Sequence, residues 1–169
     1  NMFMVTNLNT ENGLSSSRVY SIVEAEDGAM WISTKRGVDR YNGQVVTNYT
    51  LATEMQYSDA SGRTIKLLQD CNRQLYAYDN KGKIYIYNKD QDAFILKYNL
   101  LNLLGRSTVL NELLVDCKGY FWLALDHGLY WLQASVDEKE ISQKKAKGKY
   151  ILKNIYINHI QFIGQKLLV

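Results

Sequence analysis

The sequence predicts an all-β fold, and its composition already supports that class. The chain has 169 residues, of which 46% are hydrophobic and 22% are charged, which is enough apolar material for one ordinary globular core. It contains thirteen Tyr, four Phe and three Trp, and aromatic side chains are enriched in strands. Proline is absent, so tight turns must use other residues, and Asp27-Gly28, Asn42-Gly43 and Lys81-Gly82 are suitable hairpin turns.

An internal repeat of about 45 residues narrows the class to one architecture. Its three copies read VYSIVEAEDGAMWISTKRGVDRYN from Val19, TIKLLQDCNRQLYAYDNKGKIYIYN from Thr64 and LNELLVDCKGYFWLALDHGLYWLQ from Leu110. Self-similarity at such a period is typical of propellers and solenoids. Two sets of aligned positions are named here as the aromatic column, Trp31, Tyr76 and Trp122, and the glycine column, Gly37, Gly82 and Gly128.

Each copy divides into four short strands, which in the first copy are expected at 19–25, 30–35, 38–41 and 45–51. The connections are too short for crossover helices, and a sandwich would not repeat at this interval. Four antiparallel strands per repeat therefore indicate one blade. The sequence predicts a β-propeller of four-stranded antiparallel blades, present as an incomplete arc of about three and a half blades.

The repeat also predicts where each blade lies. Blade 1 is expected at 14–51, blade 2 at 62–100, blade 3 at 106–153 and the start of blade 4 at 155–169, while 3–8 is expected to be the outer strand of a missing last blade. A closed ring leaves no free sheet edge. Because three and a half repeats cannot close a ring, we expect the remaining blades of the same propeller, or a second copy, to complete it.

The aromatic column and the glycine column are both expected to have structural roles. Large flat side chains of the aromatic column should fill the wedge between neighbouring blades, where each buries roughly 150 to 250 Å². Sugar stacking is the alternative role for these rings. The glycine column is expected to supply turn positions with positive φ and not a phosphate-binding loop.

The repeat resembles that of the two-component regulator propeller family, which runs roughly V-x-x-I-x-E-D-x-x-G-x-x-W-I-x-T-x-x-G-L-x-R-Y. The third copy replaces the usual Thr with Leu125, and the second has Tyr76 for Trp, Asp79 for Thr and Arg73 for the turn Gly. The resemblance is clear over residues 3–133 and weaker beyond. The matching positions of the first copy are Leu14, Ser16, Val19, Ile22, Glu24, Asp27, Gly28, Trp31, Ile32, Thr34, Gly37, Arg40 and Tyr41.

The resemblance implies a periplasmic sensor. In this family two propellers commonly precede an immunoglobulin-like domain, a membrane helix and a histidine kinase, and many members resemble glycan sensors of hybrid systems that act as dimers. The implied function is a non-catalytic, ligand-sensing segment that responds to a glycan-derived oligosaccharide. The membrane anchor would lie outside this segment, the full-length sensor would be a homodimer, and no cofactor is implied.

Four residues are candidates for ligand binding. Arg18 and Arg63 open the first strands of their copies, and Arg106 lies shortly before the third. If the first strands line a central channel, these guanidinium groups would gather near one mouth and could hold sugar hydroxyls or a carboxylate. Tyr20 is a candidate for contact with sugar. The alternative is a set of ordinary surface arginines.

The sequence offers little for catalysis, metal or nucleic acid. His127 adjoins Asp126, but neighbours in a tight turn rarely point at one another, and no third group is evident. No His pair flanks a Glu and no C-x-x-C occurs, so no zinc site is expected. A net charge of +3 does not suggest nucleic-acid binding, and the mixed-charge run around Lys139–Lys153 is expected to be a solvated loop.

Cys71 and Cys117 occupy equivalent positions of adjacent copies. A disulfide is one alternative for an exported protein. Equivalent positions on neighbouring blades usually diverge beyond the roughly 7 Å Cα separation that a disulfide tolerates. Two free, half-buried thiols are therefore favoured.

Two other functions remain open alongside the sensor. One is a propeller enzyme of the lyase type, which would need an acid-base pair at the channel mouth. The other is a protein-interaction scaffold that dimerises through exposed blade edges.

Overall fold

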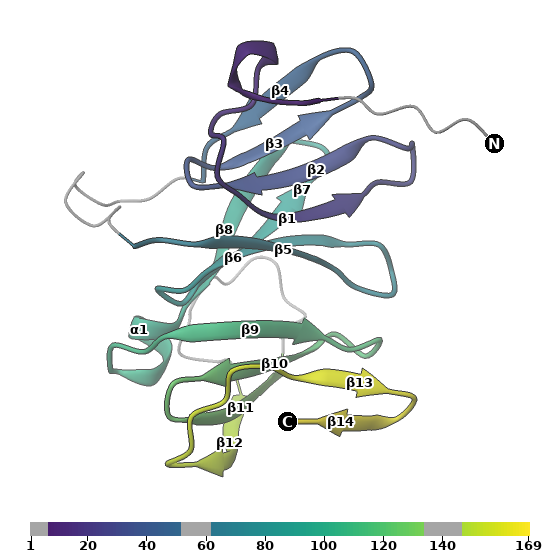
Figure 1. Ribbon diagram of the computed structural model, residues 1–169. Helices are drawn as coiled ribbons and strands as arrows, with labels where there is room; N and C mark the ends of the chain where they lie inside the picture. Colours follow the sequence, from purple (N-terminus) through teal and green to yellow (C-terminus); the bar gives the residue numbers. More distant parts are fainter. Residues whose placement is uncertain (1–6, 52–61, 134–146) are drawn as a thin grey trace.

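A computed structural model describes residues 7–51, 62–133 and 147–169. In these ranges the chain forms three four-stranded sheets and one two-stranded sheet, all antiparallel (Figure 1). This confirms the all-β class and the four-stranded antiparallel unit, and the sheets do not close into a ring. No helix within the described ranges has the length and apolar character needed to cross a bilayer.

Blade 1 is the sheet nearest the N-terminus. Its strands are β1 (Val19–Glu24), β2 (Met30–Thr34), β3 (Val38–Tyr41) and β4 (Val46–Tyr49). They pair in sequence order, and each begins within one residue of its expected position. A short 3-10 helix, η1 (Thr10–Asn12), precedes the blade.

Blades 2 and 3 repeat this order. Blade 2 consists of β5 (Ile65–Gln69), β6 (Leu75–Asp79), β7 (Lys83–Asn88) and β8 (Ala93–Asn99). A five-residue helix, α1 (Leu100–Leu104), links it to the next blade. Blade 3 consists of β9 (Leu110–Val115), β10 (Tyr120–Leu125), β11 (Gly128–Gln133) and β12 (Lys147–Lys153).

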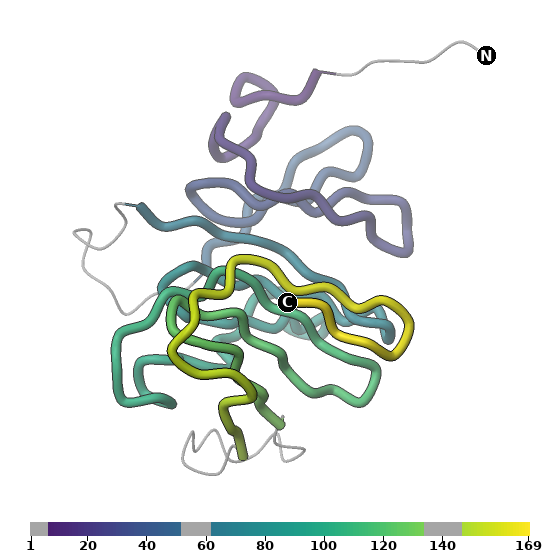
Figure 2. Tube along the Cα trace, turned by 60° about the horizontal axis from the view of Figure 1, so that its bottom comes forward, coloured from purple at the N-terminus to yellow at the C-terminus, as the bar shows by residue number. Residues whose placement is uncertain are grey.

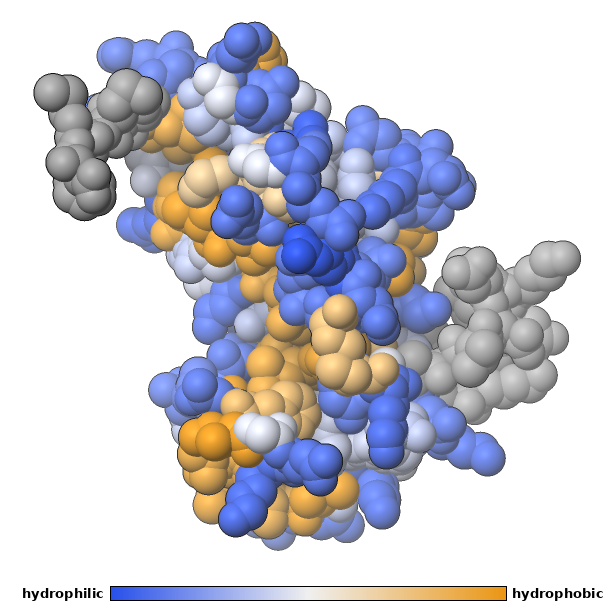
Figure 3. All heavy atoms as spheres, turned by 90° about the vertical axis from the view of Figure 1, so that its right-hand side faces the viewer, coloured by the Kyte–Doolittle hydropathy of each residue, from blue (hydrophilic) through white to orange (hydrophobic). Residues whose placement is uncertain are grey.

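The C-terminal segment forms the two-stranded sheet β13 (Gln161–Ile163) and β14 (Lys166–Leu168). It runs alongside blade 3, as the yellow trace in Figure 2 shows, and Ile157 and Ile160 pack on Ala124 and Leu129. Apolar side chains are exposed over this sheet, at the lower left of Figure 3; they include Ile163, Leu168 and Val169.

Two expectations about segments need correction or lie partly outside the described residues. The basic run is not all loop, since Lys147–Lys153 is strand β12. Lys149 and Lys153 lie over the rings of Trp131 and Tyr150, 5.9 and 5.7 Å from their centroids, because long lysine stems pack well on aromatic faces. Residues 134–146 and 1–6 are outside the described ranges, and Asn7 and Leu8 of the expected 3–8 strand are not in a strand.

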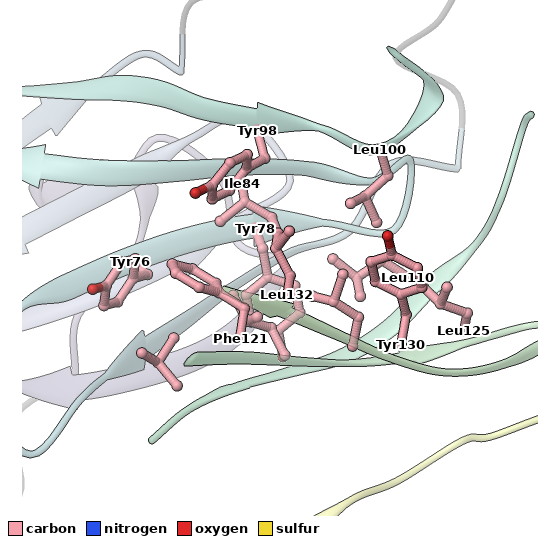
Figure 4. Close-up of a cluster of buried hydrophobic side chains, with 13 residues drawn as sticks. Tyr76, Tyr78, Ile84, Tyr98, Leu100, Leu110, Phe121, Leu125, Tyr130 and Leu132 are labelled. Atoms are coloured by element: carbon pink, nitrogen blue, oxygen red, sulfur yellow. The ribbon is translucent and has the colours of Figure 1, made fainter. Parts of the chain in front are cut away.

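The inner strands β1, β5 and β9 lie one below another in Figure 1, so neighbouring blades face each other across a wedge. Wedge 1/2, between blades 1 and 2, is filled by a cluster that includes Trp31, Ile65 and Tyr85. Wedge 2/3, between blades 2 and 3, is filled by a larger cluster (Figure 4) in which Tyr76 and Phe121 meet edge to face, 5.5 Å between centroids. The core is thus divided between wedges, as stacked sheets require.

The aromatic column lies in or beside these wedges. Trp31 is 5% exposed and touches the rings of Tyr87 and Tyr49, with centroids 4.7 and 5.1 Å away. Tyr76 is buried in wedge 2/3. Trp122 is half-buried and meets Phe162 of the C-terminal sheet, 6.1 Å between centroids.

The glycine column needs a different explanation from the one expected. Gly82 has φ 84°, but Gly37 is not in the left-handed region, so a general need for positive φ is wrong. A Cβ on Gly37 would lie 2.5 Å from the Tyr49 carbonyl oxygen, and one on Gly128 would collide with the carbonyl oxygen of Leu152. These glycines are required because the outer strand crosses them at close range.

The expectation of free, half-buried thiols is also wrong. Cys71 and Cys117 form a disulfide, with their Cα atoms 5.5 Å apart, and both residues are exposed. Each lies in the turn that directly follows an inner strand, β5 or β9, and these strands pack together. The blades have not yet diverged at this point, so the separation is within the range of a disulfide.

Candidate functional site

Polar side chains gather at the end of each blade where the inner strand begins, here named the polar end. In blade 1 the group is centred on Asp39, which is fully buried. Its carboxylate accepts hydrogen bonds from the Ser15 backbone N–H and hydroxyl, both at 2.9 Å, and from the Asn48 amide at 2.8 Å. A buried carboxylate satisfied in this way holds the segment before β1 against β3 and β4.

In blade 2 the polar end is built around Arg63, one of the predicted ligand-binding residues. Its Nε donates to Asp79 at 2.8 Å and a terminal nitrogen donates to the Tyr85 hydroxyl at 3.3 Å. Asp79 is 1% exposed and also accepts from the backbone N–H groups of Lys81 and Lys83, at 3.0 and 2.9 Å. The guanidinium of Arg63 therefore neutralises a buried carboxylate.

Burial raises the pKa of the Tyr85 hydroxyl to about 12, against the opposing effect of the Arg63 charge. The hydroxyl therefore stays neutral and acts as a hydrogen-bond acceptor for Arg63 at physiological pH. Since two of its donors are engaged inside the blade, ligand binding by Arg63 stays a prediction.

In blade 3 the polar end is a chain of hydrogen bonds through the β10–β11 turn. Asp126 Oδ1 lies 2.7 Å from His127 Nδ1 and accepts from the Thr108 hydroxyl at 2.8 Å. His127 Nε2 lies 2.7 Å from the Tyr150 hydroxyl. The expectation that the adjacent Asp126 and His127 would point apart is wrong, because Thr108 and the Val109 N–H, at 3.2 Å, hold the carboxylate over the turn.

The electrostatics of this chain of hydrogen bonds favour an ionised Asp126 carboxylate. Burial acts to raise the pKa of Asp126, but hydrogen bonds from His127, Thr108 and the Val109 N–H lower it below its ordinary value. Burial raises the pKa of Tyr150, while the positive charge of Arg106 acts in the opposite direction. With Asp126 and Thr108 at Nδ1 and Tyr150 at Nε2, both ring nitrogens of His127 have internal partners.

The other predicted ligand-binding residues lie at the same polar end. Arg18 and Arg106 are exposed just before β1 and β9. The half-buried Tyr20 donates from its hydroxyl to the backbone oxygen of Arg63 at 3.4 Å, across wedge 1/2. The fold thus brings Tyr20 to Arg63 and places Arg106 within electrostatic reach of Tyr150.

A pocket of about 200 Å³ opens at the inner margin of wedge 2/3. Its walls come from β5 and β9 with the residue before each, from β6 with the turn after it, and from the segment before β13. Lys66 Nζ spans the gap by donating to the backbone oxygen of Asn111 at 3.2 Å. The lining residues are Thr64, Lys66, Tyr78 and Asn80 of blade 2, Val109, Leu110 and Asn111 of blade 3, and Asn158.

Sequence reasoning did not single out these pocket residues. Thr64, directly before β5, and Lys66 within it alternate with Ile65 and Leu67, which face wedge 1/2 instead. That alternation was visible in the sequence and could have indicated that Lys66 faces blade 3. The contribution of Asn158, 92 residues from Lys66 in sequence, could not be read that way. Within the described ranges, no three His, Cys, Asp or Glu side chains are grouped as metal ligands.

Comparisons with known proteins agree with the repeat. A family model described as two component regulator propeller matches residues 13–36, which cover most of the first copy. No curated protein matches the chain. The match therefore lies in the copy that follows the family pattern best.

Solved structures match over most of the chain. One is described as the extracellular domain of a hybrid two component system, BT4673, from B. thetaiotaomicron; the identity is 20% and the TM-score 0.64, over 90% of this chain and 20% of that one. Another is similarly described for BT3049 of the same organism, with 18% identity and a TM-score of 0.56, over 76% of this chain and 18% of that one.

The chain spans about a fifth of the length of these structures. At such low identity the likeness shows the fold, and the repeat match supplies independent sequence evidence. The resemblance indicated by the sequence is confirmed: the chain is similar to two-component regulator propellers both in its repeat and in its fold.

Proposed function

We propose that this chain is a ligand-sensing, non-catalytic segment of a two-component sensor, located outside the cytoplasm. The observation that carries the proposal is the two component regulator propeller match at residues 13–36, in a fold similar to structures described as extracellular domains of two component systems. The periplasm is the proposed compartment. The proposed partners are the remaining blades of the propeller and a second copy of the full-length sensor.

The proposed ligand is a glycan-derived oligosaccharide bound near the polar end. Arg18 and Arg106 are exposed there and have planar donors suited to sugar hydroxyls or carboxylates. Tyr20 lies at the same end but is partly engaged with the next blade.

A thermal-shift screen of the purified protein against neutral and acidic oligosaccharides tests this proposal. A ligand at 100 times its Kd adds about 2.7 kcal/mol to the free energy of unfolding, which raises Tm by several degrees. Arg18→Gln and Arg106→Gln should each reduce the shift and leave the unliganded Tm unchanged, because both side chains are exposed. A shift with another ligand class and none with any glycan would remove the sugar from the proposal.

The acid-base pair of Asp126 and His127 makes an enzyme the second candidate. Catalysis needs a nitrogen or oxygen that can reach substrate. In this chain Nδ1 of His127 faces Asp126 and Thr108, and Nε2 faces Tyr150. The cluster therefore favours a structural role. If the protein has a hydrolase or lyase activity, retention of that activity in His127→Gln would exclude this pair as its source.

A further inference from the structure

We propose that the pocket at the inner margin of wedge 2/3 binds a small hydroxylated carboxylate, with the carboxylate held by Lys66. The inference rests on the proposed sensing function and goes further, because it names a second site, separate from Arg18 and Arg106, and the chemical class of the ligand that this site binds. It uses none of the four residues that the sequence suggested for ligand binding.

The charge of the pocket points to an anion. Lys66 brings an ammonium group to a lining that contains no Asp or Glu. Among the described residues no carboxylate pairs with Lys66, whose one hydrogen bond is to the backbone oxygen of Asn111. Asp79 and Glu112, the sequence neighbours of the lining residues Asn80 and Asn111, are engaged elsewhere: Asp79 pairs with Arg63, and Glu112 with the Ile160 N–H and with His159. A partly enclosed ammonium without a counter-ion favours a carboxylate ligand.

The hydrogen-bonding groups of the pocket separate into engaged and open ones. The Asn80 side chain accepts from the Thr64 N–H and donates to the Gly62 oxygen. The Asn111 amide donates to the Ile157 oxygen at 2.7 Å. Within the described ranges the Thr64 hydroxyl and the Asn158 amide make no hydrogen bond, and an ammonium group has three donors.

These open groups match a ligand that carries hydroxyls as well as a carboxylate. Lys66 would take the carboxylate, while the Thr64 hydroxyl and the Asn158 amide can each donate or accept. Val109, Leu110 and the ring of Tyr78 supply apolar wall for the carbon skeleton. This mixture of apolar surface and a few placed polar groups is typical of small-molecule sites.

The size of the pocket limits the ligand. Sites for drug-sized molecules usually measure about 300 to 1,000 Å³, and this one measures about 200 Å³. It therefore accommodates a single acidic sugar, either free or as the end of a longer chain. An acidic sugar satisfies both the charge and the hydroxyl requirement, and it belongs to the class of ligand proposed for the sensor.

Isothermal titration of the purified protein with D-glucuronate and with D-glucose tests the inference, since the two sugars differ chiefly in the carboxylate. We expect glucuronate to bind at least 10-fold more tightly than glucose, and the difference to shrink as salt is raised. Lys66→Gln, which keeps a donor but removes the charge, should weaken glucuronate about 10- to 100-fold. Asn158→Ala should weaken both sugars by a smaller factor.

Lys118→Gln is the matched control, because it removes the same charge from an exposed turn and should leave binding unchanged. Equal binding of the two sugars, unchanged glucuronate binding in Lys66→Gln, or no binding of glucuronate at millimolar concentration would each overturn the inference. If glucuronate fails these tests while a neutral oligosaccharide stabilises the wild-type and Lys66→Gln proteins equally, the inference is overturned and the sensing function is still supported. If no glycan binds to or stabilises the wild-type protein, the result counts against both the pocket inference and the proposed glycan-sensing function.

Discussion

Wedges 1/2 and 2/3 are built from the same repeat but differ in how closely their inner strands approach. In wedge 1/2 the Ser21 hydroxyl accepts a hydrogen bond from the Leu67 N–H at 2.8 Å, so β1 and β5 are one short side chain apart. In wedge 2/3 the equivalent residue is Lys66, whose Nζ reaches the Asn111 oxygen at 3.2 Å. A long side chain in place of a short one separates β5 from β9, and the pocket lies in the space that results.

A second position strengthens the contrast. Ser33 hydrogen-bonds to Ser21 at 2.7 Å and is fully buried, whereas its equivalent in blade 2 is the bulky Tyr78. Burial raises the pKa of Tyr78, so its hydroxyl stays neutral at physiological pH. Neither position carries a residue of the family pattern. Variation outside the pattern thus sets the width of a wedge without disturbing the blade.

At the turns that follow the inner strands, the link between neighbouring blades is stronger in wedge 2/3 than in wedge 1/2. Cys117 of blade 3 is joined covalently to Cys71, whose equivalent in blade 1 is Glu26. Glu26 faces Arg73 of blade 2 at 3.4 Å, and both side chains are largely exposed. An exposed ion pair contributes little to stability. Wedge 2/3, whose inner strands are further apart, is therefore the one whose blades are linked more strongly at the turns.

The largest expected effect comes from emptying wedge 1/2. Trp31→Ala should lower the free energy of unfolding by about 3 to 5 kcal/mol, because it leaves a cavity among Tyr49, Tyr87 and Phe94. Trp122→Ala, at the equivalent but half-buried position, should cost less. Urea denaturation measures both. Equal losses would mean that burial in the wedge does not decide the contribution of this column.

The second-largest loss of stability is expected from removing the disulfide that links blades 2 and 3. Cys71→Ser should lower the free energy of unfolding by about 2 to 4 kcal/mol, since the disulfide closes a loop between positions 46 residues apart. Glu26→Gln, the matched change in wedge 1/2, should cost less than about 1 kcal/mol. Denaturation with and without reductant checks the pair, and a wild-type curve insensitive to reductant would contradict the prediction.

A smaller loss is expected from the short contact between β1 and β5. Ser21→Ala removes the acceptor of the buried Leu67 N–H and should cost about 1 to 2 kcal/mol. Lys66→Gln, at the equivalent position of wedge 2/3, should cost less, because glutamine keeps a hydrogen-bond donor and leaves no backbone N–H without its acceptor. Hydrogen exchange at the Leu67 amide should accelerate in Ser21→Ala. An unchanged exchange rate would show that this contact does not hold wedge 1/2.

The smallest expected effect is a gain. Arg73 has φ 61° where the equivalent Gly28 and Gly119 have φ 77° and 79°, so an arginine occupies a conformation that favours glycine. Arg73→Gly should raise the free energy of unfolding by about 1 kcal/mol despite loss of the ion pair with Glu26. Gly119→Ala should act in the opposite direction, and thermal denaturation compares the two. A destabilised Arg73→Gly would mean that the ion pair outweighs the backbone strain.

Much of the blade could be predicted because the repeat compares the chain with itself. Strands β1 to β4 begin within one residue of expectation, since alternation and turn residues are local signals. The second copy keeps the turn geometry even with Arg73 in place of glycine. Local pattern and tertiary packing agree at these positions.

The candidate site was less accessible to such reasoning. Arg63 was predicted from the sequence as a ligand-binding residue, which stays a prediction, and its pairing with Asp79 and Tyr85 depends on how two strands meet. The contact of Asp126 with His127 depends on Thr108, which approaches from a preceding segment. Sequence spacing alone does not specify such directions.

The amino-acid sequence by itself determined the all-β class, the four-stranded blade and the repeat family, because these follow from periodicity within about 45 residues. Only the tertiary structure decided the disulfide of Cys71 with Cys117, the reason for the glycine column and the pocket at Lys66. Each of these depends on the distance between segments that are not neighbours in sequence. That distance is set by the side chains that fill a wedge, and no single copy of the repeat contains both of its walls.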